Sequence, residues 1–227
     1  MSTTSADRQV DQTDTQVGAQ FDALTKPVVA VRRRTIDKIM IGIGVVATGA
    51  FVVAGSLLAY GANFSDNYVH DELASQNISF PDAESLNGQG REDLVKYAGE
   101  QVTTGPQAEA YASFINGHLE ATADGQTYAD LGAVERAANA AVTEAVESDQ
   151  PQAAVDELQA QADQVTEQRN TLFKGETLRG LLLSAFAWST VGMIAGIAAI
   201  GAYIAAAVMA VLVVLGFVHL RRTPATT

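Results

Sequence analysis

Apolar residues in this chain are gathered into two long stretches. Residues 39–60 run for 22 positions without a charged side chain, and residues 181–218 run for 38 positions without Asp, Glu, Lys or Arg. About 20 apolar residues in a helix span the hydrocarbon core of a bilayer. The pattern therefore predicts an integral membrane protein. The first stretch is longer than the roughly 7–15 apolar residues of a signal peptide, so we expect it to be an uncleaved anchor.

Charges around these stretches predict the topology. The second stretch would reach roughly 57 Å as a helix, against a hydrocarbon core of about 30 Å, which is too long for one span and barely long enough for two. Basic residues mark the cytoplasmic ends of spans, and they lie before the first stretch and after the second: Arg32, Arg33, Arg34, Lys38, Arg221 and Arg222. Two spans place all of them in the cytoplasm, with the second span at roughly 191–220. Tyr60 and Trp188 are then the aromatic anchors of the outer leaflet.

The intervening residues are predicted to be helical. Apolar positions at helical spacing predict helices over 91–101, 107–123, 128–146 and 152–173. A continuation of the last of these helices into residue 181 stays open, and Pro81 ends any continuation of the first span. We expect an all-α membrane protein with two transmembrane helices and a small helical extracytoplasmic domain between them. The expected segments are a cytoplasmic tail (1–37), the first span (38–60), an acidic helical domain (61–180), a long helix that includes the second span (181–220) and a cytoplasmic C-terminus (221–227).

Composition and charge narrow the function. The net charge is −12, yet only 18% of the residues are charged and 48% are hydrophobic. Between residues 61 and 178 there are 21 acidic and 5 basic side chains, a net charge of −16. Nucleic acid is excluded as a partner, because phosphate binding needs surplus Lys and Arg. The absence of cysteine excludes disulfides, zinc–thiolate sites and iron–sulfur clusters.

Candidate chemistry is sparse, and we expect no enzyme and no cofactor beyond structural lipids. His70 and His118 each have carboxylates nearby, but at i+1 and i+2 rather than at the i+3 or i+4 spacing that one helix face requires. An enzyme would need these two histidines to converge. Residues 124–130 (DGQTYAD) superficially resemble a calcium loop without its terminal Glu. Neither span contains an ionisable group of the kind that transporters use, and His219 is a single histidine at a span end.

Small residues recur along both spans at positions that favour close helix packing. The predicted packing residues are Gly44, Ala50 and Ala54 in the first span, and Gly192, Gly196, Ala198, Ala202 and Ala206 in the second. Two alternatives remain open: the spans pack on each other, or they pack against the helices of another protein.

Four segments carry a resemblance to a known family. They are 72–81 (ELASQNISFP), 111–119 (YASFINGHL), 125–131 (GQTYADL) and 178–188 (LRGLLLSAFAW). With them the chain resembles a group of actinobacterial two-span membrane proteins, and in size it is similar to the accessory subunit of the corynebacterial cytochrome bcc–aa3 respiratory supercomplex.

This resemblance implies a non-catalytic role. The spans would pack on the core of a respiratory oxidoreductase complex, and the acidic domain would cover its outer face. The expected partners are membrane lipids and subunits of that complex, and no catalytic residues are implied. The alternative is a membrane-anchored envelope binding or sensor module with a helical extracytoplasmic domain.

Overall fold

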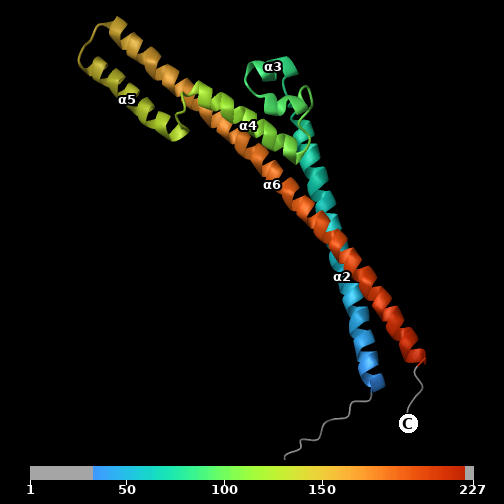
Figure 1. Cartoon of the computed structure of the whole chain (residues 1–227). Helices are drawn as coiled ribbons and strands as arrows, with labels where there is room; N and C mark the ends of the chain where they lie inside the picture. The colour runs from blue at the N-terminus through green and yellow to red at the C-terminus, as the bar shows by residue number, and fades with distance from the viewer. Residues whose placement is uncertain (1–32, 223–227) are drawn as a thin grey trace, which may run out of the picture. The chain divides into compact units, whose positions relative to one another are not determined.

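The computed structural model of the chain describes residues 33–222, and most of these residues are helical (Figure 1). The elements are α2 (Arg33–Ser75), α3 (Ala83–Gly88), the 3-10 helix η1 (Glu92–Tyr97), α4 (Gly105–Thr122), α5 (Tyr128–Glu147) and α6 (Gln152–Arg222). Among the described residues the sole β pairing is an isolated bridge between Ser79 and Gln101. The predicted all-helical class is confirmed. The expected tail up to Arg32 lies outside the described residues, as does the C-terminal segment after Arg222.

Two helices, α2 and α6, are long and apolar enough to cross a membrane, as predicted. They contain 43 and 71 residues, which corresponds to about 65 and 107 Å at 1.5 Å per residue. Each helix therefore continues far beyond the roughly 30 Å of a hydrocarbon core. The helix predicted over 152–173 and the second span form one continuous helix, α6, which begins at Gln152.

Local side-chain bonds begin the shorter helices. The Thr104 hydroxyl accepts a hydrogen bond from the backbone N–H of Gln107. In return, the side-chain oxygen of Gln107 accepts one from the backbone N–H of Thr104. Thr127 and Asp130 form the same reciprocal arrangement at the start of α5. Such capping boxes satisfy backbone donors that a helix N-terminus leaves without partners. At the start of α3, Asp82 accepts from the Ser85 amide at 2.7 Å.

Residues in the left-handed region end three of the helices. Asn77, Asp124 and Asp149 have φ values of 57°, 50° and 49°, and each follows the last turn of α2, α4 or α5. Asn and Asp tolerate this conformation better than other side chains, so short polar residues reverse the chain at these points.

The prediction of a helix over 91–101 is wrong beyond Tyr97, where η1 ends. Gly99 has φ 73°, which interrupts the helix, and the following backbone pairs with the segment before α3. The Phe80 amide donates to the Glu100 carbonyl at 2.9 Å, and the Val102 amide donates to the Ile78 carbonyl at 2.8 Å. The sequence pattern indicated apolar residues on one side of this segment but not this backbone pairing.

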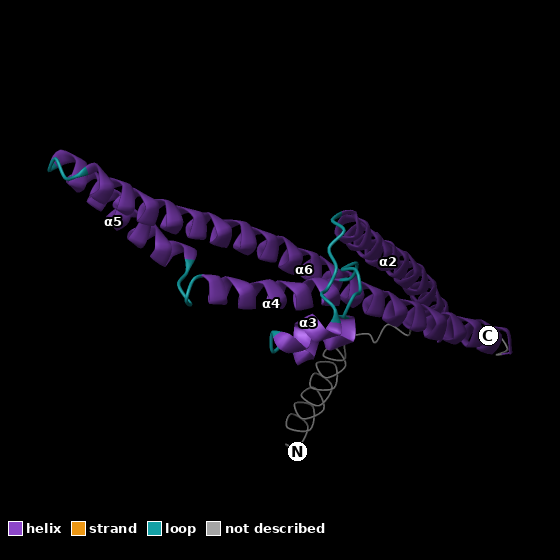
Figure 2. Ribbon diagram, turned by 90° about the horizontal axis from the view of Figure 1, so that it is seen from above, coloured by secondary structure: helices purple, strands orange, loops and turns teal. Residues whose placement is uncertain are grey.

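The chain divides into two compact units, which we describe separately. One unit contains the described residues up to Gly49 and those from Ala206 onward. The other unit, Ala50–Ala205, contains α3, η1, α4, α5 and the adjoining parts of α2 and α6. Within it, α4 and α5 lie beside α6 (Figures 1 and 2).

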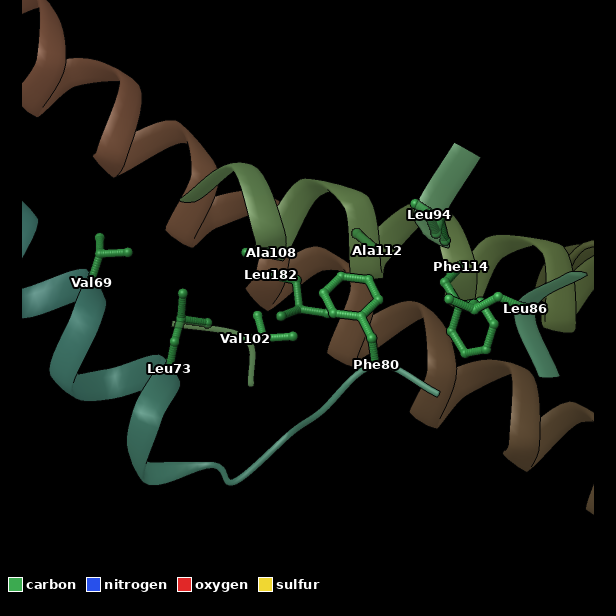
Figure 3. Close-up of a cluster of buried hydrophobic side chains, with 10 residues drawn as sticks. All are labelled: Val69, Leu73, Phe80, Leu86, Leu94, Val102, Ala108, Ala112, Phe114 and Leu182. Carbon is green, nitrogen blue, oxygen red and sulfur yellow. The ribbon is translucent and has the colours of Figure 1, made fainter. Parts of the chain in front are cut away.

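The main hydrophobic core lies in this second unit (Figure 3). It joins α2, α3, η1, α4 and α6 through ten buried residues: Val69, Leu73, Phe80, Leu86, Leu94, Val102, Ala108, Ala112, Phe114 and Leu182. A smaller cluster of Leu119, Ala123, Leu131 and Leu172 joins α4, α5 and α6. Leu182 comes from the uncharged stretch of α6, so the chain's own helices cover part of that stretch outside the predicted second span.

Candidate functional site: the paired helices and the groove beside Trp188

Gly192 brings α6 into close contact with α2 in the second unit. A Cβ atom at Gly192 would lie 2.8 Å from the Ser65 Cβ and 3.4 Å from the Ala62 carbonyl oxygen. Ser65 is buried, and its hydroxyl donates to the Trp188 carbonyl at 2.6 Å. The absence of a side chain at Gly192 therefore permits both the close approach and the hydrogen bond.

The contact continues along the two helices toward their apolar segments. A Cβ at Gly196 would lie 3.6 Å from the Ala62 Cβ. A Cβ at Gly55 would lie 3.3 Å from the Ala202 Cβ and 3.2 Å from the Tyr203 ring. Small residues thus line both sides of this pairing, as membrane helices in close contact require.

The other unit pairs the opposite ends of the same two helices. A Cβ at Gly44 would lie 2.6 Å from a Val213 methyl group, and one at Gly216 would lie 3.1 Å from the Ile41 side chain. A hollow of about 260 Å³ in this unit is lined by residues that include Asp37 and His219. The first turns of α2 and the last turns of α6, including Arg221 and Arg222, therefore share one end of this pair.

The predicted packing residues fall into three groups. Gly44, Gly192 and Ala206 are buried, and Gly196 and Ala202 are half-buried. Ala50, Ala54 and Ala198 are exposed, so they do not contribute to the contact between α2 and α6.

Three buried small residues of α6 follow a seven-residue repeat that the four-residue spacing did not reveal. On α6, Gly192, Ala199 and Ala206 are buried at intervals of seven. Two helices that pack along one seam bury residues with a mean period of 3.5, and a strict four-residue stripe drifts away from that seam. Sequence reasoning therefore missed Ala199, and it also missed Ser65, whose polarity gave no packing signal.

The two predicted aromatic anchors lie at neighbouring levels. Tyr60 and Trp188 are 72% and 56% exposed. The Trp188 carbonyl is beside Ser65, five residues beyond Tyr60 on α2, which corresponds to about 7 Å along the helix. Arg32 and the side chain of Arg33 lie outside the described residues.

An open hollow of about 320 Å³ lies between α2 and α6. We call it the Trp188 groove. Its exposed wall is formed by Tyr68, Leu178, Leu181 and Trp188, and Glu72 is its one charged lining residue. The groove therefore combines an apolar wall with one carboxylate.

An ion pair joins α5 to α6 at the far side of the second unit. The Arg169 guanidinium donates to the Glu135 carboxylate and lies 4.3 Å from the centre of the Tyr128 ring. A hydrogen bond from the Thr166 hydroxyl, followed by the bond from Arg169, lowers the pKa of Glu135. Acid conditions that protonate Glu135 would therefore weaken this junction.

Asp130 and His118, which were considered for calcium and metal binding, make contacts near the starts and along the faces of their own helices. The Asp130 carboxylate accepts from the Thr127 hydroxyl and amide, and these bonds lower its pKa. The His118 ring packs edge-on against Phe114, and His70 is exposed on α2. Within residues 33–222, no cluster of three or more His, Cys, Asp or Glu side chains is arranged to hold a metal ion.

Comparison with known proteins gives no family for the chain. No protein-family model matches it, and no curated protein or solved structure is significantly similar to it.

Proposed function

We propose that this protein is a non-catalytic accessory subunit of a membrane-bound respiratory complex of the actinobacterial cytochrome bcc–aa3 type. In this proposal α2 and α6 cross the membrane as a hairpin, and helices α3, α4 and α5 lie on the extracytoplasmic side. The four sequence segments that resemble actinobacterial two-span membrane proteins support the identity of the complex.

The distribution of charge supports the topology. Basic residues are enriched on the cytoplasmic side of membrane spans, and in the first unit the basic ends of α2 and α6 lie together. The segment between the spans carries a net charge of −16. Retention of both basic ends in the cytoplasm, with the intervening segment outside, agrees with the position of the basic residues.

The accessory role is supported mainly by a difference between α2 and α6: the exposed apolar surface of α6 continues further from the predicted spans than that of α2. Beyond Ser65, α2 exposes Asp66, Asp71 and Glu72, and Tyr68 is its one exposed large apolar side chain there. At the same levels α6 exposes Leu181 and Trp188, which are 65% and 56% exposed. Large exposed apolar surfaces outside the bilayer mark contacts with other proteins, so this part of α6 favours a subunit that packs beside a larger complex.

Affinity purification tests the role. Tagged full-length protein, extracted from the native membrane in a mild detergent, should bring down subunits of a quinol-oxidising or oxygen-reducing complex. The eluate should show haem absorption bands. A protein that elutes without oxidoreductase subunits and without haem absorption would contradict the proposal and favour the envelope binding or sensor module.

A further inference from the structure

The Trp188 groove exposes the side chains that protein interfaces favour. Leu181, Trp188 and Tyr68 are 65%, 56% and 52% exposed, and Phe64 extends the wall by stacking on Tyr68 with ring centroids 5.9 Å apart. Aromatic residues are enriched in the buried centres of interfaces, and Trp and Tyr supply many of the strongest single contacts. An exposed cluster of this kind is typical of a binding surface.

The position of the groove relative to the proposed bilayer excludes lipid acyl chains as its occupant. On α2 the groove is formed by residues beyond Ser65, in the region where Asp66, Asp71 and Glu72 are exposed. Carboxylates are costly within the hydrocarbon core. If the hairpin crosses the membrane, the groove therefore lies on the aqueous side of the interface, just beyond the apolar part of α2.

The charge of the groove favours a cationic occupant. Glu72 is the one charged residue among its described lining residues. An adjoining hollow shares Tyr68 and adds Asp71, again with no Lys or Arg among its lining residues. An anionic headgroup would meet carboxylates without a compensating cation, whereas Lys or Arg would be attracted.

Other parts of this protein do not fit the groove. A two-fold pairing of two copies through the groove would bring a Glu72 from each copy to the contact and no Lys or Arg from either groove lining, which is unfavourable. The segments outside the described range join the chain at Arg33 and Arg222, at the ends of the helices that the proposed topology keeps in the cytoplasm. They would have to cross the bilayer to reach the groove.

We propose that the Trp188 groove binds the extracytoplasmic end of a membrane-spanning helix of a partner protein, and that this helix carries Lys or Arg within its last turns. Its apolar face packs on Leu181 and Trp188, and its cation lies beside Glu72. The inference rests on the hairpin and accessory role proposed above, and it adds the surface and the chemistry of the partner.

Site-specific photocross-linking in intact cells tests the docking. A benzoylphenylalanine at position 181 of the tagged full-length chain should yield a product whose cross-linked peptide ends a membrane span and contains Lys or Arg. The matched control is position 183, where another exposed leucine of α6 does not line the groove; it should yield at least tenfold less of this product. A lipid adduct, a cross-link to a second copy, a peptide without these features, or no product at position 181 would each overturn the inference.

Charge reversal tests the role of Glu72. Glu72→Lys should reduce the product at position 181 at least tenfold, equivalent to about 1.4 kcal/mol. Asp66→Lys is the matched control on α2, because Asp66 is exposed and does not line the groove; it should leave the product unchanged. Equal yields from the two variants would overturn the charge matching. Far-UV circular dichroism of each purified variant should show unchanged helix content, so that a lost cross-link reports on docking.

These experiments separate the docking surface from the wider proposal. If oxidoreductase subunits co-purify but position 181 gives no cross-linked product, docking at the groove is contradicted and the accessory role is retained. A cross-link at position 181 to the expected kind of helix could instead come from a membrane protein that is not part of an oxidoreductase. That result would support docking at the groove and contradict the respiratory role.

Discussion

The close contact at Gly192 predicts a large effect from the smallest possible substitution. In Gly192→Ala the added Cβ would lie 2.8 Å from the Ser65 Cβ. Carbon atoms in optimal contact are about 3.5–4.0 Å apart, so α2 and α6 must separate by roughly 0.7 Å or more at this level. The separation would also lengthen the hydrogen bond from the Ser65 hydroxyl to the Trp188 carbonyl, now 2.6 Å.

The expected loss of stability combines these two effects. Overpacking a close contact costs about 1–3 kcal/mol, and a hydrogen bond between membrane helices contributes about 0.6–1.7 kcal/mol. Together they lower the free energy of unfolding by about 2–5 kcal/mol. Gly201→Ala is the control, because nothing lies within 4 Å of a Cβ at Gly201. Both substitutions gain the same helix propensity of about 1 kcal/mol, so the difference between the variants isolates the contact.

Unfolding in mixed micelles measures this difference. Full-length protein in a mild detergent is titrated with sodium dodecyl sulfate and followed by helix content and by the fluorescence of Trp188, the single tryptophan. We expect Gly192→Ala to unfold at a lower denaturant fraction than Gly201→Ala. Coincident transitions for the two variants would refute the packing argument.

Two further predictions concern the pairing of α2 with α6 and the junction of α5 with α6. The double variant Ala62→Cys, Gly196→Cys should form a disulfide under mild oxidation, seen as a mobility shift that a reductant reverses. The Cβ separation of 3.6 Å lies within the usual range of about 3.5–4.5 Å. Hydrogen bonds from Thr166 and then Arg169 lower the pKa of Glu135 in the folded protein. The ionised Glu135 therefore stabilises the fold at pH values above its pKa in the unfolded chain, and this contribution is lost as the pH falls through its pKa in the folded protein. The melting temperature should therefore fall more steeply below about pH 4.5 in the native protein than in Glu135→Gln.

Matched variants sharpen both measurements. Ala62→Cys combined with Gly201→Cys should stay reduced under the same conditions, because nothing in the structure lies close to a side chain at Gly201. Glu144→Gln removes an exposed carboxylate of α5, whereas Glu135 is half-buried, and it should keep the native pH dependence. A disulfide in the control pair, or the same acid sensitivity in Glu135→Gln as in the native protein, would show that the described contacts are incorrect.

The long helices were predictable because their signal is local. An uncharged run such as residues 39–60 indicates a membrane helix without knowledge of its neighbours, and Thr104 and Thr127 mark the starts of α4 and α5 through side-chain bonds within one turn. The interruption at Gly99 and the pairing of Phe80 with Glu100 depend on residues some 20 positions apart. A single-helix pattern does not contain that information.

The helix seam and the groove could be predicted only in part. Gly192 and Gly44 were found because small residues favour close packing, but the pattern does not say which of several small-residue faces is used. Ala54 and Ala198 belong to faces that the contact between α2 and α6 leaves open. The Trp188 groove required the register of the two helices, which is fixed by contacts such as that of Gly192 with Ser65.

Membrane topology is tested most directly with single cysteines, because the chain contains none of its own. Cysteine is introduced in separate proteins at Ser5, Ala140 and Thr226, and right-side-out spheroplasts are treated with a membrane-impermeant maleimide before and after lysis. Two spans with the helical segment outside predict that position 140 is labelled in intact spheroplasts, and that positions 5 and 226 are labelled only after lysis. Protection of position 140, or labelling of either terminal position without lysis, would contradict the hairpin on which the proposed function depends.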